Sequence, residues 1–258
     1  MALPSLSTLL ADFGDTVWRA DTLAQAAAGK GLTLPSGHAA LDAQLPGGGW
    51  PVGALCELLQ TQAGQAEWCL LLPALRTLAQ TVALVGAPWV PFGPGLAAQG
   101  LDVQALLWVQ ADALVQRLWA AEQLLGCSGV DALLLWLPQV RADHLRRLQQ
   151  AAHKHTKWLW VMRPASAQHE ASPATLRLLL GAPAAGQQGW GDVLPVQILK
   201  RRGPPLAQPL LLPACPSALC VLLALSTGSQ FNPGLCGPRQ APAPALPTHA
   251  LQQLVSAA

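Results

Sequence analysis

The segment from Ser36 to Leu72 constrains the fold of this chain more than any other. A short amphipathic turn, AALD, leads into the run PGGGWP at residues 46–51, where glycine permits positive φ and proline fixes φ, so the chain must turn there. Residues 52–59 are then apolar enough, apart from Glu57, to form a strand buried on both faces. A loop over residues 60–66 follows, and a helix is expected from Glu67. This order of parts predicts the entry to an α/β core.

The rest of the core alternates between strand and helix patterns. Strands are expected at residues 81–85, 106–109, 129–137, 157–162 and 193–199, and helices at residues 67–80, 95–100, 111–125 and 141–154. Pro73 is expected to kink the first of these helices or to mark a later start. Strands that alternate with helices, without an internal repeat, predict a mostly parallel twisted sheet flanked by helices.

Composition divides the chain into three regions. Residues 1–35 are expected to form an N-terminal helical arm, residues 36–205 the core domain, and residues 206–258 an irregular tail rich in Pro, Ala and Leu. Because prolines break helices and deny hydrogen bonds to strands, we expect the tail to be dispensable for folding of the core. Its apolar runs at 210–212 and 219–225 either dock on a neighbouring protein or fold back on the chain's own sheet edge.

Charge and hydropathy exclude several classes of protein. Charged residues make up 11% of the chain and the net charge is +2, so there is no overall nucleic-acid signature. Mean hydropathy is +0.33, yet no apolar run approaches the roughly 18 residues of a membrane span. The N-terminus has no basic segment of the signal-peptide type. The 6 cysteines form no C-x-x-C pair, so we expect a cytoplasmic protein in a reducing compartment, with no membrane contact.

The run SGHAALDAQLPGGGWPVGALCEL resembles the segment that leads into the first core strand of RecA-type ATPases. There, Ser-Gly, Leu-Asp, a Gly-rich turn and Pro-x-Gly precede a strand that ends in Glu. The run GHAALD…LPGGGWP-x-GAL-x-EL, followed by LLLPAL, is more similar still to the ImuA family of bacterial translesion-synthesis accessory proteins. The resemblance covers roughly residues 10 to 205. It implies a RecA-like core.

Three catalytic positions of a RecA-type ATPase hold residues that lack the required chemistry. A P-loop needs glycines to cradle phosphates, a Lys for the β- and γ-phosphates, and a hydroxyl for Mg²⁺. In this sequence Gly64 remains, but the Lys position falls on Ala66 or Glu67. The position of the water-polarising Glu falls on Pro88, and that of the Mg²⁺-site Asp on Trp136. We therefore expect a degenerate nucleotide site with no catalytic residues, no cofactor and no metal.

Glu57 is a carboxylate inside the first apolar strand. The RecA resemblance places it at the end of that strand, where structural hydrogen bonding rather than catalysis is its expected role. His153 and His155 suggest a metal pair, but no third ligand lies near them in the sequence, so we interpret them as solvent-facing.

Basic residues suggest two contacts with DNA or an acidic partner, and each has a structural alternative. One set lies in and around the helix expected at 141–154, where the alternative is an ordinary solvated face. The other is the run after the strand expected at 193–199, where the alternative is a charged strand end. The cluster comprises Arg141, Arg146, Arg147, Lys154, Lys157 and Arg163 with His144, His153 and His155, and the run is Lys200, Arg201 and Arg202.

The ImuA resemblance implies a non-catalytic adaptor in damage-induced mutagenesis. Its implied partners are ImuB, which is a Y-family polymerase homologue, and the α subunit of an error-prone replicative-type polymerase; RecA is a further candidate. DNA contact would be weak or indirect. The alternative is a SulA-like cell-division inhibitor, which also has a RecA-like fold without a P-loop and binds the tubulin-like division protein. An active RecA-like ATPase is the third hypothesis, and Ala66, Glu67, Pro88 and Trp136 oppose it.

Overall fold

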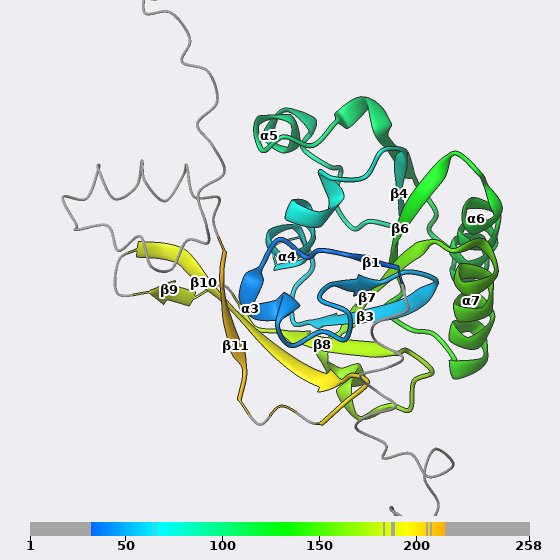
Figure 1. Ribbon diagram of the computed structural model, residues 1–258. Coiled ribbons are helices and arrows are strands. Elements are labelled where there is room, and N and C mark those ends of the chain that lie inside the picture. The colour runs from blue at the N-terminus through cyan, green and yellow to red at the C-terminus, as the bar shows by residue number, and fades with distance from the viewer. Residues whose placement is uncertain are drawn as a thin grey trace, which may run out of the picture.

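The computed structural model describes residues 32–64, 66–182, 184–186, 189–204, 206 and 208–214 (Figure 1). The strands are β1 (Thr33–Leu34), β2 (Trp50–Pro51), β3 (Ala54–Gln60), β4 (Thr81–Val85), β5 (Leu106–Val109), β6 (Val130–Trp136), β7 (Trp158–Pro164), β8 (Leu176–Leu180), β9 (Ala184–Gly186), β10 (Gly189–Lys200) and β11 (Leu210–Pro213). The α-helices are α3 (Ala39–Asp42), α4 (Ala66–Leu75), α5 (Gly93–Ala98), α6 (Leu114–Gly126) and α7 (Ala142–His155), with 3-10 turns η2 (Val103–Ala105) and η3 (Ala165–His169).

A 9-stranded sheet forms the centre of the described chain. Its order is β11-β10-β8-β3-β7-β6-β4-β5, with β9 paired to β10. Every neighbouring pair from β8 to β5 is parallel, whereas β10 runs antiparallel to β8, β9 and β11. The chain is therefore an α/β protein with a mostly parallel sheet flanked by helices, as its sequence predicts.

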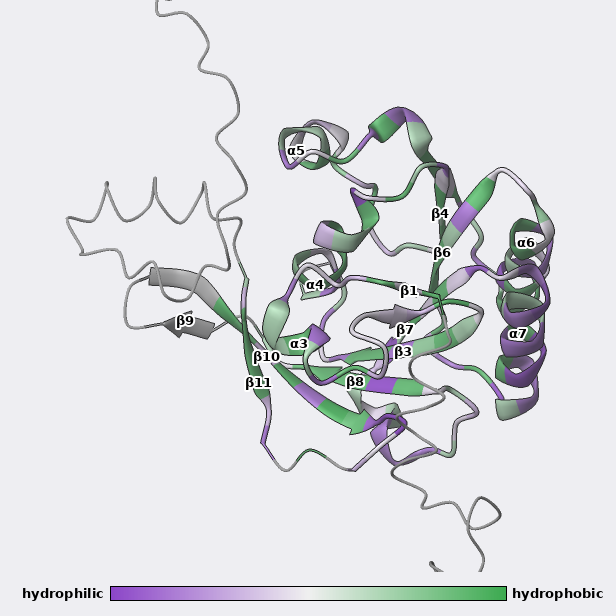
Figure 2. Ribbon diagram, in the orientation of Figure 1, coloured by the Kyte–Doolittle hydropathy of each residue, from purple (hydrophilic) through white to green (hydrophobic). Residues whose placement is uncertain are grey.

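Two apolar clusters hold helices on the two faces of the sheet. Alternate residues of β3 show the division, because Leu55 packs in one cluster while Cys56 and Leu58 pack in the other. The first cluster contains α6 and α7, and the second contains α3 and α4 (Figure 1). Figure 2 shows the matching hydropathy, with apolar strands in the middle and a largely hydrophilic α7. The strands are apolar on both faces because both faces are covered.

The Gly-rich turn forms a small second sheet, which the sequence did not predict. Within it, β2 pairs antiparallel with β1. A Cβ on Gly49 would lie 2.4 Å from the carbonyl oxygen of Leu34, so only glycine fits there. Gly37 has a φ of +80°, and a Cβ there would lie 2.4 Å from Cβ of Pro73 in α4. The two glycines therefore allow the segment to lie directly against β1 and α4.

Several predicted boundaries are confirmed and others are wrong. Strands at 81–85 and 106–109 match β4 and β5. Helix α4, expected to reach residue 80, ends at Leu75, two residues after Pro73. Pro73 therefore does not mark a late start, but lies in the final turn of the helix. Pro73 has no backbone N–H to donate to the preceding turn, and the helix ends two residues after it.

The boundary predicted at residue 205 is wrong, because the sheet continues beyond it. Residues 210–213 form β11, which pairs with β10 along Val193–Val196. Leu212 is 1% exposed and belongs to the core cluster that includes α4. The apolar run at 210–212 thus folds back on the chain's own sheet. The predicted helical arm up to residue 31, the run at 219–225 and the remainder of the tail lie outside the described residues.

No helix among the described residues is long and apolar enough to cross a membrane.

His38 gives the fold a pH dependence. Its side chain is buried, and desolvation by burial lowers the pKa of the imidazole, while the backbone of Leu70 and Cys69 and the carboxylate of Asp42 oppose this effect. The unfolded chain therefore binds a proton at a higher pH than the folded chain. We expect the free energy of unfolding to fall as pH drops below about 6.5, by at most about 1.4 kcal/mol per pH unit.

Urea unfolding between pH 7.5 and the onset of acid unfolding would measure this slope, with His38→Gln as the comparison. The variant should lose part of the slope. An unchanged slope would show that other groups cause the pH dependence.

Candidate functional site

The loop between β3 and α4 holds the residues that the sequence resemblance aligns with a P-loop. Gly64 has a φ of +99°, and a Cβ there would lie 2.7 Å from Cδ1 of Trp89. Glycine is therefore required both by the backbone conformation and by the indole that packs against it. Trp89 comes from the segment between β4 and α5, so two loops meet at this point.

Glu67 places a carboxylate inside this loop. Its side chain is fully buried in the first turn of α4. The backbone N–H of Gly64 donates to its Oε1 over 2.6 Å, and the indole Nε1–H of Trp136 donates to the same oxygen over 3.4 Å. The chain's own carboxylate thus accepts a hydrogen bond from the backbone N–H of Gly64. In a P-loop, such an N–H would point toward phosphate.

The electrostatic consequence is unfavourable for a nucleotide. A carboxylate about 4 Å from a phosphate charge costs on the order of 4 kcal/mol at an effective dielectric of 20. Ala66 begins α4 and is 3% exposed, so it offers neither a charge nor an open surface. A turn at Gly64 thus leads into α4, and a buried carboxylate lies at the start of that helix.

Arg117 closes the neighbouring part of the same edge. From the first turn of α6, its Nε donates to the carbonyl of Ala111 over 2.7 Å and its Nη1 to the carbonyl of Trp136 over 2.9 Å. A Cβ on Gly86 would lie 2.6 Å from Nε of this guanidinium. A cavity of about 340 Å³ lies here, lined by Pro88, Trp89 and Arg117 among others.

The structure thus brings together the degenerate positions that lie far apart in the sequence. Glu67 contacts Gly64 and Trp136 directly, and Pro88 is next to Trp89, whose ring packs on Gly64. The sequence did not indicate Arg117, because nothing in its local pattern shows that α6 begins beside the end of β6. Among the described residues, no group of three or more His, Cys, Asp and Glu side chains is placed to hold a metal ion.

A second buried polar cluster lies within the sheet around Glu57. Its Oε2 accepts from Nε of Arg177 over 2.6 Å, and its Oε1 accepts from Nη1 of Arg163 over 3.3 Å. Arg163 also pairs with Glu170 over 2.6 Å, and Arg177 donates to the carbonyl of Ala167 over 2.8 Å. The structural role expected of Glu57 is confirmed. The assignment of Arg163 to the surface basic cluster is wrong, because its side chain is 2% exposed.

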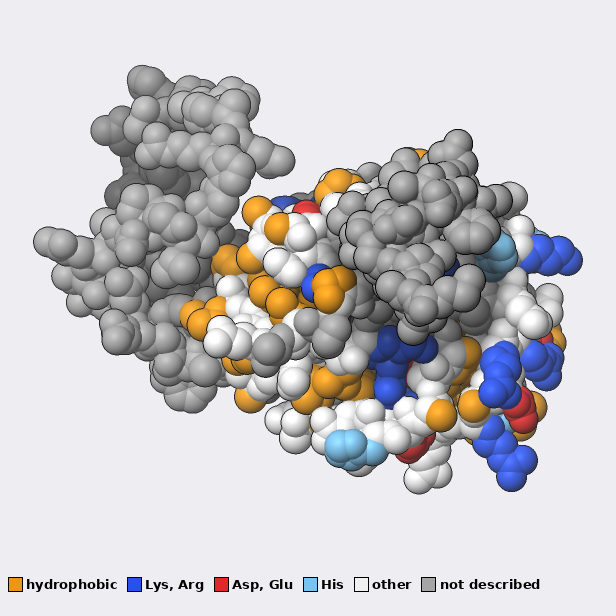
Figure 3. All heavy atoms as spheres, turned by 60° about the horizontal axis from the view of Figure 1, so that its bottom comes forward, with side chains coloured by type: hydrophobic (Ala, Val, Ile, Leu, Met, Phe, Trp, Pro, Cys, Tyr) orange, Lys and Arg blue, Asp and Glu red, His pale blue; other side chains and the backbone are white. Residues whose placement is uncertain are grey.

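The other residues of the predicted basic cluster lie mainly on α7. Arg141, which precedes the helix, Arg147 and Lys154 are exposed. Arg147 pairs with Glu122 of α6 over 2.8 Å, and Arg146 pairs with Asp143. Lys and Arg side chains gather on the right of Figure 3, on the side where α7 lies in Figure 1. His153 and His155 are exposed, as expected.

The basic run after β10 is tied to the fold at two of its three positions. Nζ of Lys200 donates to the carbonyl of Ser172 over 3.0 Å. Arg201 donates to the backbone and side-chain oxygens of Gln44 and, over 2.9 Å, to the carbonyl of Pro204. Arg202 is exposed. The structural alternative for this run is therefore supported for Lys200 and Arg201.

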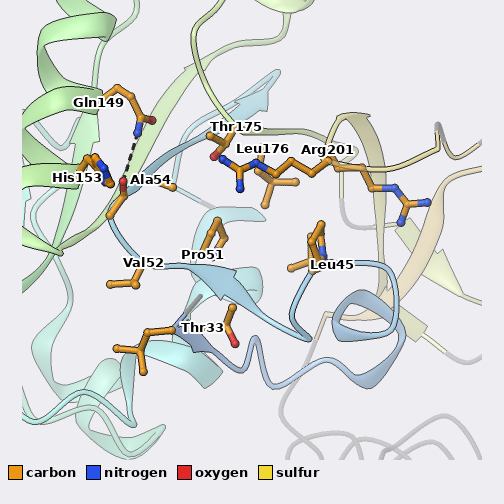
Figure 4. Close-up of a pocket in the computed structure, with 14 residues that line it drawn as sticks. Thr33, Leu45, Pro51, Val52, Ala54, Gln149, His153, Thr175, Leu176 and Arg201 are labelled. Atoms are coloured by element: carbon orange, nitrogen blue, oxygen red, sulfur yellow. Dashed lines mark hydrogen bonds between the residues drawn. The ribbon is translucent and has the colours of Figure 1, made fainter. Parts of the chain in front are cut away.

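A cavity of about 320 Å³ joins the two basic regions (Figure 4). It lies at the amino end of β3, and Arg201 and Arg202 line it together with His153 of α7. Gln149 of α7 supports its wall by donating to the carbonyl of Gly53 over 3.2 Å. The cavity is at the opposite end of β3 from the loop that holds Gly64 and Glu67, so the two candidate sites are separate.

Neither a scan of protein-family models nor a search of curated proteins finds a match for this chain.

Glu67→Lys tests what the buried carboxylate does. Lysine has no acceptor, so the buried indole N–H of Trp136 would lose Glu67 as its partner, at about 1–3 kcal/mol for a buried group left unsatisfied; the N–H of the exposed Gly64 can turn to water. We expect a lower free energy of unfolding by urea and no ATP hydrolysis, because phosphoryl transfer also needs the metal and the water-positioning group. Ala66→Lys should likewise produce no turnover.

Glu67→Gln is the matched control. It keeps an acceptor oxygen and nearly the same shape, so its stability cost should be much smaller. ATP turnover by either lysine variant would contradict the interpretation of this site.

Proposed function

We propose that this chain is a RecA-like protein without ATPase activity, of the ImuA type, and that it acts as an adaptor. The observation that carries the proposal is the contact of Glu67 with Gly64 and Trp136. A negative side chain lies where a P-loop would bind phosphate, and the residue aligned with the Mg²⁺-site Asp holds it there. A protein with these features acts by offering its surface to binding partners and not by hydrolysing nucleotide.

The order of strands supports the RecA-like part of the proposal. In this sheet β7 lies between β3, which precedes the loop, and β6, which ends at Trp136. RecA-type cores also place one strand between the P-loop strand and the Walker B strand. The helices on both faces and the parallel pairing of these strands agree with the same architecture.

The pathway rests on the sequence run GHAALD…LPGGGWP-x-GAL-x-EL. Through it we propose a cytoplasmic accessory protein of bacterial translesion synthesis and damage-induced mutagenesis. Its partners would be ImuB and the α subunit of an error-prone polymerase, with RecA as a further candidate.

Equilibrium binding of a fluorescent ATP analogue with Mg²⁺ tests the absence of nucleotide chemistry. We expect no saturable binding in the micromolar range, and a Mg²⁺-dependent micromolar affinity would overturn the proposal. Pulldown with purified ImuB and, separately, with the tubulin-like division protein tests the pathway. Retention of ImuB alone supports the adaptor role, whereas retention of the division protein alone supports the SulA-like alternative.

Any DNA binding by this chain should be weak and electrostatic. Among the described residues, exposed cations gather at the start of α7, along it and at Arg202, and phosphate contacts of this kind release counterions, so affinity should fall steeply with salt. Replacing Arg141, Lys154 and Arg202 together with Glu should abolish DNA binding in a fluorescence anisotropy titration. Reversing Arg163 would be uninformative because it is buried. Affinity that is unchanged at high salt would contradict this prediction.

A further inference from the structure

One edge of the sheet exposes a group of large apolar side chains. Two belong to β5, the edge strand, and three belong to the segment between β4 and α5. Their side chains are 37–72% exposed. The five residues are Leu107 and Trp108 in the strand, and Trp89, Val90 and Phe92 in the segment. We call them the β5 surface. Trp89, Val90 and Trp108 line one cavity, so the segment meets the strand on the face where Trp108 lies, whereas Leu107 lies on the opposite face.

The strand itself is unusual for an edge. Its sequence, LLWV, is that of a parallel strand covered on both faces, yet Leu107 and Trp108, which point to opposite faces, are both exposed. Edge strands are normally protected by charged residues or proline. The opposite edge strand, β11, ends in Pro213, whereas β5 has neither a charge nor a proline. Its outer row of backbone N–H and C=O groups pairs with no described strand.

We propose that β5 is a self-association edge, on which a second copy of this chain pairs its own β5. A two-fold axis perpendicular to the sheet would set the two strands antiparallel, so their free backbone groups would form one ladder and the two sheets would become continuous. The same axis would place the β5 surface of one copy against that of the other.

Area and charge both fit this occupant. One side of a standard interface covers about 800 Å², of which roughly 57% is apolar. The β5 surface exposes on the order of 500 Å², given the size of two Trp, one Phe and two aliphatic side chains. Neither β5 nor residues 88–92 contain a charged residue, and the two charged residues that line the cavity between them, Asp112 and Arg117, are of opposite sign. Nucleic acid and acidic peptides would find no cation in either segment.

The cavity beside the strand offers room for side chains of the second copy. It measures about 340 Å³ and opens between Trp89 and Trp108. Arg117, which lines it, already donates to two backbone carbonyls and so stiffens the wall. A side chain of the facing copy that enters would meet Gln110 and Asp112 as well as the two indoles.

Sedimentation of the full chain over a wide range of concentrations tests the proposal. We expect a monomer–dimer equilibrium. Leu107→Lys and Val90→Lys should each weaken the dimer at least about thirtyfold, because each places two like charges in an apolar interface. The control is Leu211→Lys, which changes an exposed leucine on the other edge strand and should leave the dimer intact.

Hydrogen exchange of the β5 amides provides the second measurement. Protection at Leu106–Val109 should rise with concentration in the unmodified chain and not in Leu107→Lys. A chain that stays monomeric at all concentrations would overturn the proposal. This includes the outcome in which β5 is protected from exchange at every concentration because another part of the same chain covers it. A dimer that survives Leu107→Lys, or that Leu211→Lys weakens equally, would also overturn it.

Discussion

Glu57→Ala is expected to lower the free energy of unfolding by about 3–5 kcal/mol. The reason is that Glu57 is fully buried and is the shared partner of Arg163 and Arg177, whose side chains are 2% and 8% exposed. In the variant, Arg163 would keep its ion pair with the exposed Glu170, but Arg177 would keep only its hydrogen bonds to backbone carbonyls. The total free energy of unfolding of a domain is only roughly 5–15 kcal/mol. A loss of this size should therefore shift the midpoint of a urea titration clearly.

Asp143→Ala is the control for this experiment. It removes the partner of Arg146 in a pair whose side chains are 81% and 62% exposed, and exposed pairs contribute only about 0–1 kcal/mol. Equal costs for the two variants would mean that the Glu57 cluster is not desolvated in solution.

Leu212→Ala should cost about 2–5 kcal/mol, the range for a buried leucine truncated to alanine. Leu212 lies in β11 with 1% exposure, packed in the cluster that includes α4. Leu211, the adjacent residue, is 65% exposed, and Leu211→Ala should change stability by no more than about 0.5 kcal/mol. Comparing the thermal or urea midpoints of the two variants separates the effect of burial from the effect of local strand propensity.

A chain that ends at Pro205 gives the more severe version of the same test. It removes β11 and leaves β10 without its neighbour at that end of the sheet. We expect poor solubility or loss of the cooperative transition. A truncated chain with the midpoint of the full chain would restore the idea that the tail is separate from the core.

The sequence predicted those parts of the fold that depend on local pattern. Strands β4 and β5 are apolar runs bounded by turn residues, so both ends were correct. The Gly-rich turn before β3 was also recognised, because Gly and Pro restrict the backbone in known ways. The RecA resemblance predicts three degenerate positions in separate segments, and the structure shows that two of these residues, Glu67 and Trp136, are in contact.

Pairing between distant segments could not be predicted in the same way. Nothing in the run LLLP distinguishes an antiparallel strand at the end of a sheet from an apolar stretch in a tail, so the sequence leaves open whether residues 210–212 dock on another protein or join the sheet as β11. Arg163 was grouped with surface cations because arginine is rarely buried. Only its position beside Glu57, in the neighbouring strand β7, explains its burial.

The central position of β3 has a consequence for the synthesis of this chain. Its neighbours β7 and β8 lie about a hundred residues downstream, and Arg177 is 120 residues away from Glu57. Contacts over such separations form slowly, and an apolar strand that waits for them is exposed to aggregation. During this interval the carboxylate of Glu57 is an uncompensated charge in the middle of the run ALCELLQ. A charge in that position opposes premature strand stacking, and the arrival of β7 and β8 neutralises it when the correct partners are present.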